Sequence, residues 1–280
     1  MSRQLNKLGL QNIALFFAGG FNGKLLRDSI SKEDINFSII TTKSNTRECA
    51  VIFDSRNKKA HYFFQKNSAI TKEEKEKFLQ KLEKMIQNSE IVVFSGSSPS
   101  TNADDIFPTG IDMANKYDKI SICDTYGKHL LNCLDAAPKI IHNNLTEIEN
   151  SLSLKLSNEK DKLEFLKSLY GKGIKQVFIT DGENDFYASN FDFHYKVSVP
   201  KIEPVDPTGS GDAFVAGISY AWHKNLTFNE SLQFAAALGA INAKSFDVCN
   251  VSHDSIKSFS EKITVQSIGK KIKIIDDTPD

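Results

Sequence analysis

The sequence lacks the cysteine patterns that build disulfide frameworks or structural zinc sites. Its 280 residues include 4 cysteines, with no Cys-x-x-Cys pair and no histidine at zinc spacing nearby: Cys49, Cys123, Cys133 and Cys249. Scattered cysteines are typical of proteins that stay in a reducing compartment. We therefore expect a cytoplasmic protein without disulfides or a structural metal.

An excess of charge of either sign is also lacking. The 35 Lys and Arg residues balance 35 Asp and Glu residues, so the formal net charge is zero. This balance argues against a protein that binds nucleic acid or a membrane surface through bulk electrostatics. No apolar run reaches the ~20 residues of a membrane span, and the first residues do not resemble a secretory leader. We expect a soluble protein whose partners are small molecules, with no nucleic acid and no membrane.

Short apolar runs alternate with patterns of helical period along most of the chain. The alternation predicts an α/β fold, with a doubly wound, mostly parallel sheet and helices on both faces. Ligands of such sheets gather at the carboxyl ends of the strands. No repeat or low-complexity linker divides the chain, so we expect one domain over residues 1–280. The runs predicted as buried strands are 13–18, 91–94, 119–123, 139–141 and 175–180.

Two further regions are predicted to form antiparallel hairpins. Residues 49–53 and 60–64 are β-rich and flank turn residues at 54–57, and residues 186–189 and 193–199 form a second pair. The first hairpin is expected to stand apart from the main sheet. Helices are predicted at 228–245 and 254–263, and a basic run at 270–273 is interpreted as solvated.

The most informative stretch is a glycine-rich loop that leads into a helix. Gly209 and Gly211 flank Ser210 immediately before Asp212, and an apolar helical pattern follows. Glycine lets the backbone lie against a ligand, and the first N–H groups of a helix bind anions such as phosphate. A carboxylate beside a phosphate would repel it, unless it takes a proton from the attacking hydroxyl. Asp212 is therefore either a general base or an ordinary helix N-cap.

A second group of polar residues follows the predicted strand at 139–141. Asn144 and Glu147 are three apart, so both side chains can reach the crevice at the end of that strand. Mg²⁺ prefers oxygen ligands and touches the protein at only one or two carboxylates, keeping several waters. The alternative is a capping box, with Asn144 as N-cap and Glu147 at the third helical position. The spacing alone leaves both interpretations open.

The string from Asp206 to Phe214, Asp-Pro-Thr-Gly-Ser-Gly-Asp-Ala-Phe, resembles the second signature of the ribokinase-like, PfkB family of carbohydrate kinases. The resemblance implies that Asp212 is the catalytic base. It also implies that the amides of Gly209, Ser210 and Gly211 form the anion hole, with ATP and Mg²⁺ as cofactors. Glu147 and Asn144 would then hold the Mg²⁺, partly through water.

The same resemblance implies further binding residues and a partner. ATP would be bound by Thr180, Gly182, Thr208, Gly209, Gly211 and Asn242, and the sugar by Gly19, Gly20, Asn22 and Arg47, together with Asp212. Gly19 and Gly20 could equally serve a tight turn, and Arg47 could be an ordinary surface residue. Residues of about 37–66 are implied to form a small antiparallel β lid over the sugar, through which a homodimer could form.

The order of motifs is most similar to the branch of 1-phosphofructokinases and tagatose-6-phosphate kinases. It implies transfer of the γ-phosphoryl group of ATP to fructose 1-phosphate, or alternatively to tagatose 6-phosphate. Two features depart from the family pattern. His142 and Asn143 replace a Lys-Pro pair, and the family's first strand and Gly-Gly-Lys-Gly segment, which precede the helix that residues 1–10 resemble, are not in this sequence. A nucleotide-binding remnant without sugar kinase activity is therefore the alternative to an active kinase.

Overall fold

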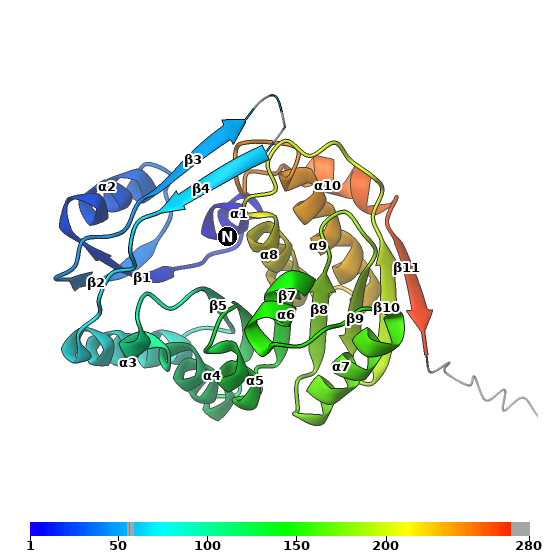
Figure 1. Ribbon diagram of the computed structural model, residues 1–280, viewed down its shortest axis with the longest axis horizontal. Helices are drawn as coiled ribbons and strands as arrows, with labels where there is room; N and C mark the ends of the chain where they lie inside the picture. The colour runs from blue at the N-terminus through cyan, green and yellow to red at the C-terminus, as the bar shows by residue number, and fades with distance from the viewer. Residues whose placement is uncertain (55, 57–58, 270–280) are drawn as a thin grey trace, which may run out of the picture.

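The structure, a computed structural model, describes residues 1–54, 56 and 59–269. The predicted basic run at 270–273 lies outside these residues, and the predicted turn at 54–57 lies partly outside them. Helices and strands alternate along most of the described chain (Figure 1). They are α1 (Ser2–Lys7), β1 (Ala14–Gly19), α2 (Gly20–Ser31), β2 (Phe37–Thr42), β3 (Cys49–Asp54), β4 (Lys59–Phe64), α3 (Lys72–Gln87), β5 (Ile91–Gly96), the 3₁₀ helix η1 (Thr101–Ala103), α4 (Ile106–Lys116), β6 (Ile120–Thr125), α5 (Leu130–Asp135), β7 (Ile140–Asn144), α6 (Leu145–Leu152), α7 (Glu159–Gly171), β8 (Gln176–Thr180), β9 (Phe186–Asn190), β10 (Phe193–Ser198), α8 (Ser210–His223), α9 (Phe228–Asn242), α10 (His253–Ser260) and β11 (Thr264–Ile268).

The main sheet has seven strands in the order β11-β10-β9-β8-β7-β6-β5. Strands β5 to β8 pair in parallel, and β8 to β11 pair in antiparallel fashion. The predicted α/β fold and the hairpin formed by β9 and β10 are confirmed. Strand β11 was not predicted, because its residues Thr264–Ile268 are mostly exposed at the edge of the sheet and show no apolar run.

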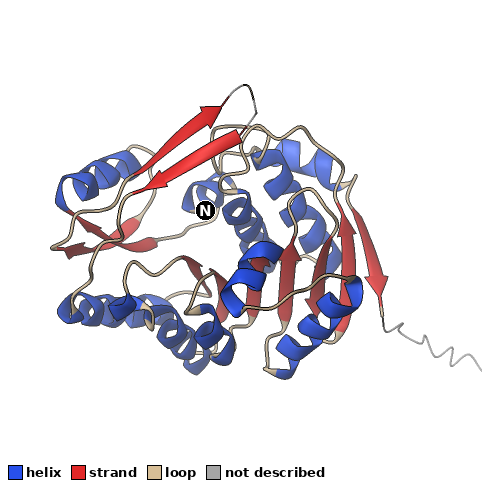
Figure 2. Ribbon diagram, viewed as in Figure 1, coloured by secondary structure: helices blue, strands red, loops and turns tan. Residues whose placement is uncertain are grey.

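Helices cover both faces of the main sheet, as predicted (Figure 2). Val177 and Ile179 of β8 pack into the core beneath α4 to α7, whereas Phe178 between them packs into the core beneath α8 and α9. Side chains of a strand point alternately to the two faces, and both faces are buried here. This explains why the strands read as continuous apolar runs. Each such side chain contributes roughly 1.5–3 kcal/mol by leaving water.

Strands β1 and β2 form a parallel pair of their own, and β3 and β4 form a separate antiparallel hairpin. The hairpin was predicted, but the antiparallel part is narrower than the expected range of 37–66. Strand β2 pairs with β1 instead, because Ile40 of β2 is buried in the core that Leu15 and Phe17 of β1 contact. Among the described residues, β1 has no second strand partner, and β5 ends the main sheet.

The hairpin reaches from the unit formed by β1, α2 and β2 to the helices that follow β10 (Figure 1). The hydroxyl of Tyr62 lies 2.8 Å from Oγ1 of Thr208, and the ring of Phe53 meets that of Phe246 edge-on at 5.4 Å. Within the described residues, no helix has both the length and the apolar character needed to cross a bilayer.

Helices α8 and α9 pack closely because Gly217 of α8 lies against Ala235 of α9. A Cβ atom at position 217 would lie 2.7 Å from the Cα atom of Ala235. Both glycine and valine are weak helix formers, so a change between them mainly tests the available space. Position 171, at the end of α7, has open space around a Cβ atom and serves as the matched control.

We expect Gly217→Val to lower the free energy of unfolding by about 1–3 kcal/mol, since overpacked cores lose stability of this order. The Gly171→Val variant should change it by less than about 0.5 kcal/mol, as surface substitutions usually do. Urea unfolding of both variants measures this difference. Equal stability of the two variants would show that the α8–α9 contact tolerates a side chain.

Candidate active site

A cavity of about 1170 Å³ opens at the carboxyl ends of β5 to β8, beside the first turn of α8. This is the place that the parallel sheet topology predicts for a ligand. Eight of the predicted site residues line it: Asn144, Glu147, Thr180, Gly182, Gly209, Ser210, Gly211 and Asp212. Apolar walls are supplied by residues such as Pro200, Ile202 and Ala240.

The loop before α8 has the conformation that an anion site requires. Gly209 is the N-cap of α8 with φ of 73°, in the left-handed region that favours glycine. A Cβ atom there would lie 2.2 Å from Cγ1 of Val248, so a side chain would also collide with its neighbour. No described residue accepts a hydrogen bond from the backbone N–H groups of Gly211 and Asp212. These two donors and the helix dipole can therefore bind an anion.

The backbone N–H of Ser210, predicted to form part of the anion hole, is hydrogen-bonded within the loop. This N–H donates to the carbonyl of Pro207 at 3.1 Å, and the hydroxyl of Ser210 accepts a hydrogen bond from Asn242. Of the three amides predicted to form the anion hole, the one of Ser210 is thus already engaged. The amide of Asp212, which follows Gly211, is the additional donor that the structure offers.

Asn242, predicted to contact ATP, is buried behind the loop and does not line the cavity. Its side-chain amide donates to the carbonyl of Thr208 at 2.9 Å and accepts from the backbone N–H of Cys249 at 2.7 Å. Thr208 also does not line the cavity, and its N–H and hydroxyl both donate to Asp206. Asn242 and Thr208 therefore hold the loop in place, and their side chains form hydrogen bonds within the protein.

Asp212 lies in the first turn of α8 and faces the cavity. The structure does not support the N-cap interpretation, because Gly209 is the N-cap and no side chain caps this helix. Burial between the cavity walls raises the pKa of Asp212, and the nearby Asp124 raises it further. The α-amino group of Met1, 3.7 Å away, and His142 act in the opposite direction. A carboxylate with a raised pKa is a better proton acceptor than an ordinary aspartate.

Behind Asp212 lies a polar cluster that the sequence analysis did not assign. His142 Nδ1 is 2.9 Å from a carboxylate oxygen of Asp124, and its Nε2 is 3.3 Å from the hydroxyl of Thr180. The imidazole also stacks on Phe214 at 4.8 Å. His142 and Asp124 end neighbouring parallel strands, and that shared position is the signal by which the sequence could have indicated them.

Asn144 and Glu147 form the capping box that was one of the two interpretations. Asn144 Oδ1 accepts from the N–H of Glu147 at 2.8 Å, and a carboxylate oxygen of Glu147 accepts from the N–H of Asn144 at 3.1 Å. The other oxygen of Glu147 accepts no hydrogen bond from the described residues, and both side chains line the cavity. One available carboxylate oxygen fits a largely hydrated Mg²⁺. The described residues contain no cluster of three or more acidic, histidine or cysteine ligands.

Apart from Asp212, the residues predicted to bind the sugar do not line this cavity. Gly19 and Asn22 are hydrogen-bonded to Thr46 in the loop between β2 and β3, and Gly20 begins α2. Arg47 donates to Asn67 and lies over the ring of Phe64, 5.0 Å from its centre. The structure thus groups these residues with one another, at the base of the hairpin, but does not place them around Asp212.

The raised pKa of Asp212 predicts how stability depends on pH. Below the ordinary aspartate value of about 3.9, the group is protonated in both the folded and unfolded states. As the pH rises through the raised folded value, ionisation of this partly desolvated carboxyl, whose side chain is 45% exposed, increasingly costs stability. The Asp212→Asn variant avoids this cost, so its free energy of unfolding should exceed that of the unmodified protein by a margin that grows with pH. Urea unfolding from pH 4 to 8 measures the margin, and a constant margin would contradict the raised pKa.

Comparisons with known proteins agree with this fold. A model of the pfkB family of carbohydrate kinases matches residues 1–254. The fold is similar to that of a possible 1-phosphofructokinase from Thermotoga maritima, with a TM-score of 0.86 and 22% identity over 96% of this chain and 86% of that one. Phosphofructokinase-2 from Escherichia coli is similar in a structure with potassium (TM-score 0.85, 20% identity, covering 93% and 85%) and in one with fructose 6-phosphate (0.81, 21%, 93% and 84%). The family model covers most of the chain, and the chain therefore belongs to the pfkB family of carbohydrate kinases.

Proposed function

We propose that the protein transfers the γ-phosphoryl group of MgATP to a hydroxyl of a phosphorylated ketose, with fructose 1-phosphate as the best candidate. The observation that carries the proposal is that the carboxyl group of Asp212 lies beside the backbone N–H groups of Gly211 and of Asp212 itself, which are unbonded within the described chain, at one edge of the cavity. A proton acceptor and an anion site in contact are what phosphoryl transfer to an alcohol requires. The four cysteines are unpaired, which fits a cytoplasmic location.

In the proposed reaction, Asp212 accepts the proton of the acceptor hydroxyl as that oxygen attacks the γ-phosphorus. The N–H groups of Gly211 and Asp212 donate to the oxygens of the transferred group, where negative charge gathers in the transition state. Because Gly209 and Asn242 hold these donors in place before the substrate arrives, little reorganisation is needed during transfer. Thr180 and Gly182, at the end of β8, are proposed to contact the nucleotide.

Mg²⁺ is the proposed metal cofactor, as in the pfkB sugar kinases generally. Glu147 would hold it through the oxygen that the capping box leaves available, and Asn144 would act through bound water. When bound, the ion would neutralise charge on the phosphate oxygens. The capping box fixes the orientation of the Glu147 carboxylate, so the same contacts that start α6 would also position the metal ligand.

The acceptor is proposed from the order of the motifs and from the residues around β1. Gly19, Gly20, Asn22 and Arg47 are proposed to bind the sugar phosphate, with the guanidinium of Arg47 near its phosphate. Tagatose 6-phosphate is the alternative acceptor. A structural neighbour, phosphofructokinase-2 from Escherichia coli, has been solved with fructose 6-phosphate, so that sugar is a useful third acceptor in an assay.

The role of Asp212 as a base is tested by the Asp212→Asn variant. We expect kcat with fructose 1-phosphate to fall by about 10²–10⁴-fold, because proton transfer is lost, while affinity for MgATP stays nearly unchanged. A coupled assay of ADP release and calorimetric titration of MgATP measure the two quantities. Near-normal turnover of the variant would exclude the assignment.

The second candidate is a nucleotide-binding protein without sugar kinase activity. It is favoured by the separation of the proposed sugar-binding residues from the cavity that contains Asp212. Separate calorimetric titrations with MgATP and with each sugar phosphate distinguish the two candidate functions. Binding of both MgATP and fructose 1-phosphate supports the kinase, and binding of MgATP with no affinity for any of the three sugar phosphates supports the alternative.

We also propose that two copies associate through the β3–β4 hairpin. Phe53 and Tyr62 share the face from which they contact Phe246 and Thr208, so Ile52 and Phe63 belong to the opposite face. Ile52 and Phe63 are 57% and 59% exposed. An isolated two-stranded sheet is only marginally stable, and an exposed apolar face is typical of an interface.

A double variant, Ile52→Lys with Phe63→Lys, should shift the protein from dimer to monomer, since charge on both partners would be buried together. Phe191→Lys, which changes an exposed aromatic residue between β9 and β10, is the matched control and should leave the dimer intact. Light scattering during gel filtration measures the mass. A monomeric unmodified protein, or a dimer that persists in the double variant, would contradict this interface.

A further inference from the structure

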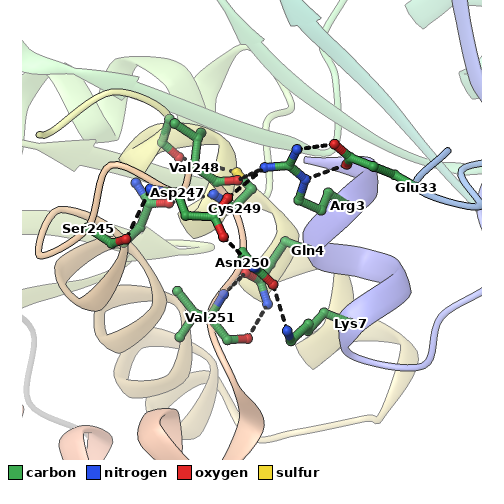
Figure 3. A network of polar contacts seen from close by, with 12 residues as sticks. Arg3, Gln4, Lys7, Glu33, Ser245, Asp247, Val248, Cys249, Asn250 and Val251 are labelled. Carbon is green, nitrogen blue, oxygen red and sulfur yellow. Dashed lines mark hydrogen bonds and ion pairs between the residues drawn. The ribbon is translucent and has the colours of Figure 1, made fainter. Parts of the chain in front are cut away.

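Helix α1 is joined to the loop between α9 and α10 by a set of side-chain contacts (Figure 3). The buried amide of Gln4 donates to the carbonyl of Val251 at 3.0 Å and accepts from its N–H at 2.9 Å. Lys7 donates to the side chain of Asn250 at 2.6 Å. Arg3 donates to the carboxylate of Asp247 at 3.1 Å and to the carbonyl of Val248 at 2.8 Å.

The loop that α1 holds in this way lies directly behind the anion site. Val248 occupies the space that a side chain at Gly209 would need, and the thiol of Cys249 lies 3.6 Å from the carbonyl of Gly209. The N–H of Cys249 donates to Asn242, whose amide in turn holds the carbonyl of Thr208. A displacement of Val248 or Cys249 would therefore move the amides that are proposed to bind phosphate.

Two residues of α1 also reach a third segment, just after α2. Asn6 donates to the carbonyl of Asp34 at 3.2 Å, and Arg3 contacts both this segment and the loop. Its guanidinium donates to both carboxylate oxygens of Glu33, just beyond the end of α2 (Figure 3). The hydrogen bond from Arg3 lowers the pKa of Glu33, so the pair stays ionised at neutral pH. Helix α2 starts at Gly20 and includes Asn22, which are proposed to bind the sugar. Arg3 thus connects the sugar-binding segment with the loop behind the anion site.

From these contacts we infer that Arg3 is a positioning residue for phosphoryl transfer: it fixes α2 relative to the phosphate-binding loop. The inference rests on the proposed kinase function. The guanidinium of Arg3 makes four hydrogen bonds at once, two to Glu33 and one each to Asp247 and the Val248 carbonyl, whereas a lysine ammonium has three N–H donors and no planar fork that matches a carboxylate.

The expected effects on stability and on rate distinguish a positioning role of Arg3 from a purely structural one. Partly exposed ion pairs contribute only about 0–1 kcal/mol to stability, and the Arg3 side chain is 36% exposed. A misplacement of about 1 Å between reacting groups can cost about 10²-fold in rate. Loss of Arg3 should therefore damage the reaction much more than the stability of the fold.

The test compares Arg3→Met with Lys7→Met, which removes a contact from α1 to the same loop but none to Glu33. We expect Arg3→Met to lower kcat by about 10–100-fold, with less than a twofold change in MgATP affinity and a melting temperature close to that of Lys7→Met. Arg3→Lys should recover only part of the loss, and Glu33→Gln should add little to the effect of Arg3→Met. Equal kcat values for Arg3→Met and Lys7→Met would overturn the inference.

A second measurement does not depend on turnover. Hydrogen exchange is followed in α2 with and without MgATP: binding at the loop should slow exchange in α2 of the unmodified protein and of Lys7→Met, but not of Arg3→Met. If this pattern is found without any turnover, the coupling stands and the kinase proposal fails. If MgATP leaves α2 unchanged in the unmodified protein, or protects it equally in Arg3→Met, the coupling is overturned whatever the turnover.

Discussion

The N-terminus of α8 is the constraint on which the rest of the structure depends. The N–H groups of Gly211 and Asp212 can receive an anion only while Gly209 stays in its left-handed conformation. A loop that satisfied these donors internally would lose the anion site, so the loop has to be held by other groups. Asn242 holds the loop by a hydrogen bond to the carbonyl of Thr208, and Val248 packs against Gly209. The conformation of the proposed anion site is thus set largely by residues that do not line it.

The same constraint explains the chemistry placed beside the anion site. Asp212 is half-buried, and this partial desolvation raises its pKa. The helix pair α8 and α9 behind it is densely packed. Asp124 and His142 lie next to Asp212 and act on its pKa in opposite directions. Because their effects on Asp212 are opposite in sign, they partly cancel, and partial burial remains the largest influence.

Patterns that are local in sequence were predicted well. The strand around Phe178, the hairpin of β3 and β4, and the capping box of Asn144 and Glu147 all follow from periodicity or from residues three apart. Contacts that depend on how distant segments pair were not predicted. Asp124 and His142 meet because β6 and β7 are adjacent. Strand β2 falls within the range predicted for the antiparallel lid but pairs with β1, because Ile40 is buried beside β1. Asn242 was predicted to contact the nucleotide, because its position in the sequence does not show that its side-chain amide is hydrogen-bonded to Thr208 and Cys249.

Transfer to a sugar needs the acceptor, the γ-phosphorus and Asp212 within reacting distance, yet the proposed sugar-binding residues line no wall of the cavity. The acceptor must then be presented by segments that bridge the two regions. The bridges in the described chain include Tyr62 of the hairpin, which meets Thr208, and Arg3, which joins Glu33 to Asp247 and Val248. Each bridge links residues far apart in sequence, so the geometry of the reaction is a property of how the units are assembled. The loop at 206–214 indicates phosphoryl transfer, whereas the packing of distant segments against one another determines whether a sugar can reach Asp212.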